Sequence, residues 1–231
     1  MVSLVIHTNM GLENQRLCAT ALKNGFKRHG IEAQVTPDVK QAADLHVIQG
    51  PWYAYREWLG QPNVIWLDRC FYGCAKTVIS LGWLNADGSR DFRDCDKPAK
   101  GELPELLPAK PMRRCAVVFG DYGRDPRPDI KDAERRYDSV FYRPHPSETG
   151  LCVLRPLRGE LSAVFEIGDV AIGHGSTVLV DAEIHGLHVE CSDPRHVVHH
   201  TGDRETWLRE LSWKQWSLDE LRAGTFWEHL C

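Results

Sequence analysis

The residues best suited to chemistry lie in two short polar segments, each of which directly follows an apolar run. The first segment reads Phe141-Tyr-Arg143-Pro-His145-Pro. Its two prolines stiffen the backbone and fix the direction in which His145 leaves the run. An imidazole held in this way can donate a hydrogen bond to a phosphate oxygen, and the Arg143 guanidinium can add a bidentate contact. The alternative is a rigid proline turn with a solvated histidine.

The second segment reads Ile172-Gly-His-Gly175-Ser176-Thr177 and leads into a helical pattern. Gly175 allows the backbone to approach a ligand closely, and backbone N–H groups at the start of a helix attract anions. The hydroxyls of Ser176 and Thr177 would add to such a site. The alternative is that these hydroxyls only cap the helix, which is a common use of serine and threonine. Because both segments lie in the same half of the chain, they predict a site for a phosphate-bearing ligand.

A reaction at a hydroxyl group would also need a base, and carboxylates that follow apolar runs are the candidates. Asp68 directly follows Val64-Ile-Trp-Leu67, and Glu13 follows the first apolar run of the chain. A carboxylate at such a position can remove a proton from an acceptor hydroxyl. Asp68 is slightly favoured, because Phe71 and Tyr72 nearby could stack on a sugar or a base. The alternative for both is a carboxylate that only begins a helix or forms a turn.

Apolar periodicity in the N-terminal half predicts strands that alternate with helices. The predicted strands are Ser3–Thr8, Ile31–Val35, Leu45–Ile48 and Asn63–Leu67, and the predicted helices are Leu17–His29 and Tyr53–Leu59. This alternation is typical of a mostly parallel sheet with helices on both faces. Ligands of such sheets bind beyond the carboxyl ends of the strands, which is why the residues after each strand are the candidate site residues.

The periodicity lapses from Ser80 to Pro111, and we predict a linker at residues 80–111 because this segment is rich in Asp, Lys, Pro and Gly. Pattern resumes in residues 112–203. The predicted strands there are Arg114–Phe119, Ser139–Tyr142, Asp169–Ile172 and Leu187–Cys191, and the predicted helices are Ile130–Tyr137, Leu161–Ile167 and Thr177–His185. Asp121 begins the loop after the first of these strands, which would face the cleft, and its partner could be the donor or the linker. The predicted fold class is therefore α/β, with two Rossmann-like lobes at residues 1–79 and 112–203 and a cleft between them.

Residues 204–231 predict a tail of two amphipathic helices rich in tryptophan. These tryptophans are Trp207, Trp213, Trp216 and Trp227. We expect them to pack across the two lobes, because large aromatic side chains contribute most when buried. The alternative is that they stack on a base or a sugar.

Composition limits the remaining possibilities. The chain has 231 residues, 42% of them hydrophobic, and a formal net charge of −4, which weakens binding to DNA without excluding it. No apolar run approaches the roughly 20 residues that span a bilayer, and the N-terminus lacks the features of a secretory signal, so a soluble, cytoplasmic protein is expected. The scattered cysteines predict reduced thiols rather than disulfides or a zinc site, since closely spaced pairs of ligands are missing.

Residues 139–193 resemble the donor-binding half of GT-B glycosyltransferases. The resemblance is to those members that carry an "HP" motif followed by a Ser motif, among them bacterial sialyltransferases, Kdo and capsule transferases and the glycerophosphotransferases of teichoic acid synthesis. The matching residues are His145-Pro146 and Ser176-Thr177. The resemblance implies that His145 and Ser176 contact the phosphates of a nucleotide-sugar donor, with Arg143 and Thr177 in support. The donor would be a co-substrate, and no other cofactor is expected.

The resemblance thus implies a transferase that moves a sugar to an acceptor hydroxyl. Metal independence is expected because no D-x-D sequence follows a predicted strand; Asp94-Cys-Asp96 lies in the predicted linker. The acceptor would be a saccharide or, because the tail is similar to the ends of small transferase-like proteins of tailed bacteriophages, a hydroxymethylated base in phage DNA. The alternatives are a sugar-nucleotide epimerase or glycerophosphotransferase with the same fold, and a catalytically silent binding module.

Overall fold

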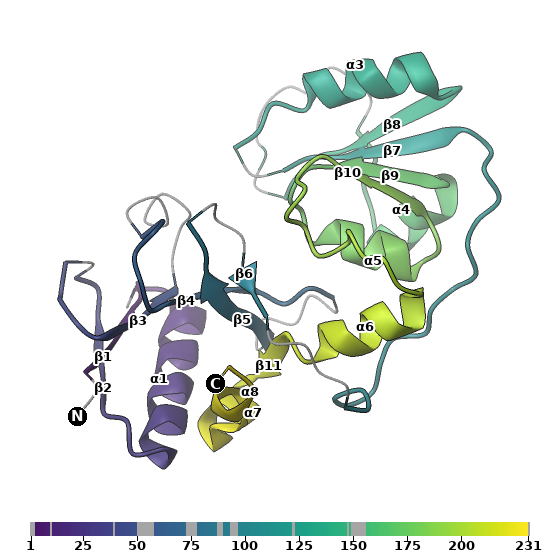
Figure 1. Cartoon of the computed structure of the whole chain (residues 1–231). Coiled ribbons are helices and arrows are strands. Elements are labelled where there is room, and N and C mark those ends of the chain that lie inside the picture. Colours follow the sequence, from purple (N-terminus) through teal and green to yellow (C-terminus); the bar gives the residue numbers. More distant parts are fainter. Residues whose placement is uncertain are drawn as a thin grey trace. The chain divides into compact units, whose positions relative to one another are not determined.

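A computed structural model of the chain describes residues 3–9, 11–38, 40–49, 58–72, 78–86, 90–92, 97–121, 123–146, 148 and 156–230. The chain divides into two compact units, shown in Figure 1. Unit 1 consists of Met1–Gly101 and Leu208–Cys231, and unit 2 is Glu102–Trp207. Both units combine helices with a sheet that contains parallel strands, which confirms the predicted α/β class.

The sheet of unit 1 has the strand order β11-β5-β4-β3-β1-β2, with β6 paired to β5. Its strands are β1 (Leu4–His7), β2 (Ala33–Thr36), β3 (Leu45–Gln49), β4 (Val64–Arg69), β5 (Val78–Leu84), β6 (Arg90–Asp91) and β11 (Gln215–Ser217). Strands β1 to β4 run parallel, whereas β5 is antiparallel to β4 and β11 is antiparallel to β5. The four parallel strands are those predicted from the sequence. The helix predicted at residues 53–59 falls mostly outside the described residues.

Strand β5 corrects the prediction of a linker that begins at Ser80. Its apolar residues do alternate, and Ile79 and Leu81 are buried against the same core as Trp216. Ser80 and Gly82 are typical loop residues, but here both have packing roles. The Ser80 hydroxyl donates to the Arg69 carbonyl (2.8 Å), and a Cβ at Gly82 would lie 2.9 Å from the Asp91 carbonyl oxygen of β6.

The sequence predicted a purely helical tail, and the structure corrects this prediction. It contains α6 (Arg204–Ser212), strand β11, α7 (Leu218–Ala223) and α8 (Thr225–Leu230). The chain passes from unit 2 to unit 1 within α6, since Trp207 belongs to unit 2 and Leu208 to unit 1. Trp216 is buried in the core of unit 1 and pairs with Ile79, which explains why an amphipathic pattern here forms a strand rather than a helix.

Helix α1 (Glu13–Arg28) begins four residues before the predicted helix and packs against α7. Gly25 is buried where the two helices meet. A Cβ at this position would overlap the Leu221 carbonyl oxygen and lie 2.8 Å from the Phe226 ring. The close approach of α1 and α7 therefore requires a glycine.

Replacing Gly25 with alanine should destabilise unit 1 by about 2 to 3 kcal/mol, because the added methyl group forces α7 away from α1. Asn24→Ala is the matched control, since Asn24 is the exposed neighbour on the same helix and alanine favours helix. Urea unfolding followed by tryptophan fluorescence measures both variants. If the two variants have equal unfolding midpoints, the packing described for Gly25 is incorrect.

Unit 2 contains a parallel sheet with helices on both faces, as Figure 1 shows. Its strands are β7 (Cys115–Phe119), β8 (Ser139–Arg143), β9 (Val170–Gly173) and β10 (His188–Cys191), in the order β10-β9-β7-β8. Val117, Phe119 and Ala171 pack on the side of α4 (Leu161–Ile167) and α5 (Val178–Ile184). The alternate residues of the same strands pack on the side of α3 (Arg127–Arg136). These strands and helices are the ones predicted from periodicity.

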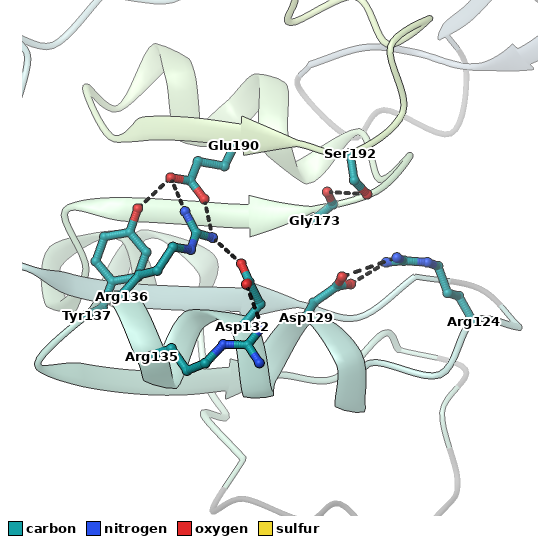
Figure 2. A network of polar contacts seen from close by, with 9 residues as sticks. All are labelled: Arg124, Asp129, Asp132, Arg135, Arg136, Tyr137, Gly173, Glu190 and Ser192. Carbon is teal, nitrogen blue, oxygen red and sulfur yellow. Dashed lines mark hydrogen bonds and ion pairs between the residues drawn. The ribbon is translucent and has the colours of Figure 1, made fainter.

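A network of polar contacts joins the end of α3 to β10 (Figure 2). Arg136 makes a bidentate pair with Glu190 (2.9 and 2.7 Å) and also contacts Asp132 (2.8 Å). The Tyr137 hydroxyl donates to the same Glu190 carboxylate. Burial acts to raise the pKa of Glu190, but the hydrogen bonds from Arg136 and Tyr137 outweigh it and hold that pKa below its ordinary value.

Because its pKa is lowered in the folded state, Glu190 should stabilise unit 2 above its ordinary pKa of about 4.3 and lose this contribution as the pH falls through the folded value. Glu190→Gln should cost no more than about 1 kcal/mol at neutral pH, since the pair is partly exposed, and the cost should vanish at low pH. Urea unfolding at several pH values measures this. Glu134→Gln, at an exposed site on α3, should show no such trend. A cost that is independent of pH would contradict the ion pair.

Candidate functional site

The strand order of unit 2 creates a point where consecutive connections leave in opposite directions. From β7 the chain crosses to β8 on one side, whereas β9 lies on the other side of β7 and is followed outward by β10. The loops that follow β7 and β9 therefore diverge, and open α/β sheets bind ligands in the crevice at such a position. The candidate site consists of the loops that follow β7, β8 and β9 at this edge of the sheet.

The loop after β7 packs directly on the loop after β8. A Cβ at Gly120 would lie 2.7 Å from the His145 backbone nitrogen and 2.6 Å from the Tyr142 hydroxyl. The Gly120 N–H also donates to the Arg143 carbonyl (2.8 Å), and the Glu148 N–H donates to the His145 carbonyl (2.8 Å). His145 is thus half-buried in a closed turn beside Gly120.

The Arg143 guanidinium is engaged by backbone groups of unit 2. Its Nη1 donates to the Leu157 carbonyl (3.0 Å) and its Nη2 to the Gly159 carbonyl (2.8 Å). These bonds fix the segment that leads toward α4 against the end of β8. They also occupy two of the guanidinium nitrogens, so Arg143 braces this segment, and its contact with phosphate stays a prediction.

The loops after β7 and β9 are joined by a hydrogen bond. The Gly175 N–H donates to Asp121 Oδ2 (2.8 Å), and a Cβ at Gly175 would lie 3.3 Å from the same oxygen. Asp121 is therefore located at the predicted edge, with Gly175 as a partner. Because these residues are far apart in the chain, only the order of the strands brings them together.

Ser176 and Thr177 precede α5 and lie at the same edge. Thr177 is the N-cap residue, but its side chain makes no capping hydrogen bond. The backbone carbonyls of both residues accept the first helical bonds, from the Leu179 and Val180 N–H groups. Within the described part of the chain, helix capping by the Thr177 hydroxyl is therefore not seen, and a role for Ser176 and Thr177 in binding a ligand stays a prediction.

The two candidate bases lie in unit 1 and are not brought together. Asp68 is exposed near the end of β4, where its Oδ1 accepts the Arg69 N–H (2.7 Å). Glu13 is exposed at the first position of α1, which follows β1. Strand β3 lies between β1 and β4 in the sheet. Glu13 thus follows a parallel strand, whereas Asp68 lies within β4 and pairs with Ser80 of β5. A catalytic role for either one stays a prediction.

Comparisons with known proteins give a structural match but no sequence match. No family model matches the chain, and no curated protein sequence matches it. Among solved structures, the beta Kdo 2,7 transferase KpsC of Thermosulfurimonas dismutans is similar, with a TM-score of 0.56 and 12% sequence identity. The match covers 98% of this chain and 99% of that one. The chain shares its fold with a Kdo transferase.

Unit 1 contains a group of polar side chains that was not singled out in the sequence. His7 is buried; its Nδ1 lies 2.9 Å from the Asp38 carbonyl oxygen and its Nε2 lies 3.0 Å from His46 Nδ1. Trp58 packs on both rings, with centroid distances of 4.9 and 4.5 Å. Burial lowers the pKa of both histidines, so the pair is neutral at pH 7. In the sequence each histidine lies within a predicted strand, and only the pairing of β1 with β3 brings the two together.

The described residues were searched for metal sites and for membrane-spanning helices. They contain no group of three or more His, Cys, Asp or Glu side chains placed to hold a metal ion. Within the same residues, no helix is both long enough and apolar enough to cross a membrane.

Proposed function

We propose that this protein is a GT-B glycosyltransferase that moves a sugar from a nucleotide-activated donor to an acceptor hydroxyl. The observation that carries the proposal is the meeting of three loops at the switch point of unit 2. These loops follow β7, β8 and β9, and they supply Gly120, His145 and the Ser176-Thr177 pair. Similarity of fold to a Kdo transferase over nearly the whole chain supports the same proposal.

In this proposal the donor phosphates bind across the candidate site. His145 and the hydroxyls of Ser176 and Thr177 donate hydrogen bonds to phosphate oxygens, and Gly175 allows the backbone to come close to them. Arg143 holds the segment around Leu157 and adds positive charge. Because neutral donors, an imidazole and a guanidinium can together stabilise the phosphates, we propose that transfer needs no metal ion.

Unit 1 would supply the acceptor side of the reaction in a two-lobed GT-B arrangement. Asp68 or Glu13 would remove the proton from the acceptor hydroxyl, because each is an exposed carboxylate: Asp68 near the carboxyl end of β4 and Glu13 at the start of α1. The acceptor is a saccharide or a hydroxymethylated base in phage DNA. Product analysis with each acceptor class distinguishes the two, and it also separates glycosyl transfer from epimerisation or glycerophosphate transfer.

A thermal-shift screen against nucleotides and nucleotide sugars tests the proposal. A ligand that binds only the folded state raises the melting temperature by mass action. We expect at least one nucleotide sugar and its free nucleotide to stabilise the protein, and donor hydrolysis or transfer to persist when a chelator is added. The proposal is wrong if no nucleotide or nucleotide sugar stabilises the protein at millimolar concentration.

A further inference from the structure

The loop that follows β9 is held on both sides of His174. On one side the Gly175 N–H donates to Asp121 (2.8 Å). On the other, the Ser192 N–H donates to the Gly173 carbonyl (3.0 Å), and the Cys191 thiol donates to the His174 carbonyl. The backbone of His174 is therefore fixed by the loops after β7 and β10, within the loop after β9 that forms part of the candidate site.

The imidazole of His174 is oriented by a serine. Its Nδ1 lies 2.9 Å from the Ser192 hydroxyl oxygen, which in turn lies 3.4 Å from the Gly173 carbonyl oxygen, a contact drawn in Figure 2. A carbonyl oxygen can only accept, so both contacts are satisfied when Ser192 donates to Gly173 and accepts from the Nδ1–H of His174. This arrangement leaves the lone pair on Nε2 of His174, and within the described residues no hydrogen bond occupies that nitrogen.

Protonation of Nε2 would keep both of these hydrogen bonds, because Nδ1 already carries its proton. Two carboxylates lie on the loops that hold His174. Asp121 lies on the loop after β7, and Asp193 on the loop after β10 is paired with Arg195 (2.8 Å). Burial raises the pKa of the Cys191 thiol to about 11, so that group is neutral at pH 7.

We propose that His174 is a ligand-contacting residue of the donor site and that Ser192 is its positioning residue. The Nε2–H of the protonated imidazole donates to an anionic phosphate oxygen of the nucleotide. This inference rests on the proposed function, since it assigns a further residue to the same phosphate site.

Calorimetric titration of the full chain tests this, with inorganic pyrophosphate and each ribonucleoside mono- and diphosphate as probes. For the probe that binds the wild type, His174→Gln should weaken binding about tenfold, because the variant loses a charge-assisted hydrogen bond to phosphate. Ser192→Ala should give a smaller loss, and Ser192→Thr, which keeps the hydroxyl, should restore binding. His188→Gln, at the amino end of β10, is the matched control and should bind as the wild type does.

Ring-nitrogen NMR of the ligand-free protein gives a second readout of the positioning role. In the wild type we expect neutral His174 to carry its proton on Nδ1, because Ser192 accepts a hydrogen bond from it. In Ser192→Ala we expect the proton on Nε2, because a histidine ring without a partner favours the Nε2–H form. Equal affinities of wild type and His174→Gln would overturn the inference while leaving the proposed function in place. If no probe binds the wild type, both the inference and the proposed function are wrong.

Discussion

Replacing Ser176 with alanine should weaken binding of the nucleotide donor by a factor of about 10 to 100, and His145→Ala should have an effect of similar size. Each variant removes one donor to a charged phosphate oxygen, and such hydrogen bonds contribute about 1.5 to 3 kcal/mol. The Ser176 hydroxyl makes no capping bond within the described residues, so its loss should leave α5 intact. Calorimetry with the nucleotide identified by thermal shift measures the change.

Ser139→Ala is the matched control for this experiment. Ser139 is an exposed serine at the first position of β8, at the opposite edge of the same sheet from Ser176. The control variant should bind the nucleotide with wild-type affinity. If Ser176→Ala and Ser139→Ala bind equally well, the loop after β9 is not the phosphate site.

Replacing Asp169 with alanine should destabilise unit 2 by about 3 kcal/mol, since three backbone donors lose a charged acceptor. Asp169 is buried at the amino end of β9, where Oδ1 accepts the Cys115 N–H (2.8 Å) and Oδ2 accepts the Arg114 N–H (3.0 Å). Oδ2 also accepts the Arg113 N–H. These bonds fix the start of β7 against β9, where sheet pairing begins.

Hydrogen exchange of the amides in β7 and β9 measures this loss directly, because it reports on unit 2 without assuming that the whole chain unfolds in one step. Asp138→Ala is the control, since Asp138 forms an exposed ion pair with Arg114 (3.1 Å). Such a pair contributes at most about 1 kcal/mol. Equal protection of β7 and β9 in the two variants would mean that Asp169 does not organise the sheet.

The fold of unit 2 could be predicted from the sequence because its central strands are apolar at nearly every position. In β7, Val117 and Phe119 face one side and Ala116 and Val118 the other, and all four are buried. A run that is apolar at every position is typical of a parallel strand covered on both faces. The helices between the strands follow from their own periodicity in the same way.

The edge of unit 1 could not be predicted in this way. Strand β5 contains Ser80 and Gly82, whose roles depend on Arg69 and on the neighbouring strand β6. Strand β11 has only three residues between two helices, so its pairing with β5 depends on a partner far away in the chain. Local pattern carries no information about such long-range partners.

The same distinction applies to the candidate site. Its loops were predicted because polar residues follow strands, and that rule needs only the order of elements. The bond of Gly175 to Asp121 and the contact of His174 with Ser192 were missed. Both depend on which strands are neighbours, and therefore on the position of the switch point between β7 and β9.

The central claim is that nucleotide phosphates bind at the switch point of unit 2, and mapping of amide chemical shifts during titration with a nucleotide sugar tests it most directly. The account predicts that saturating ligand changes the amide chemical shifts of Gly120, Asp121, His145, Gly175 and Ser176. The amide chemical shifts at the amino ends of the same strands should not change. Shifts confined to unit 1, or no shifts with any nucleotide sugar, would contradict it.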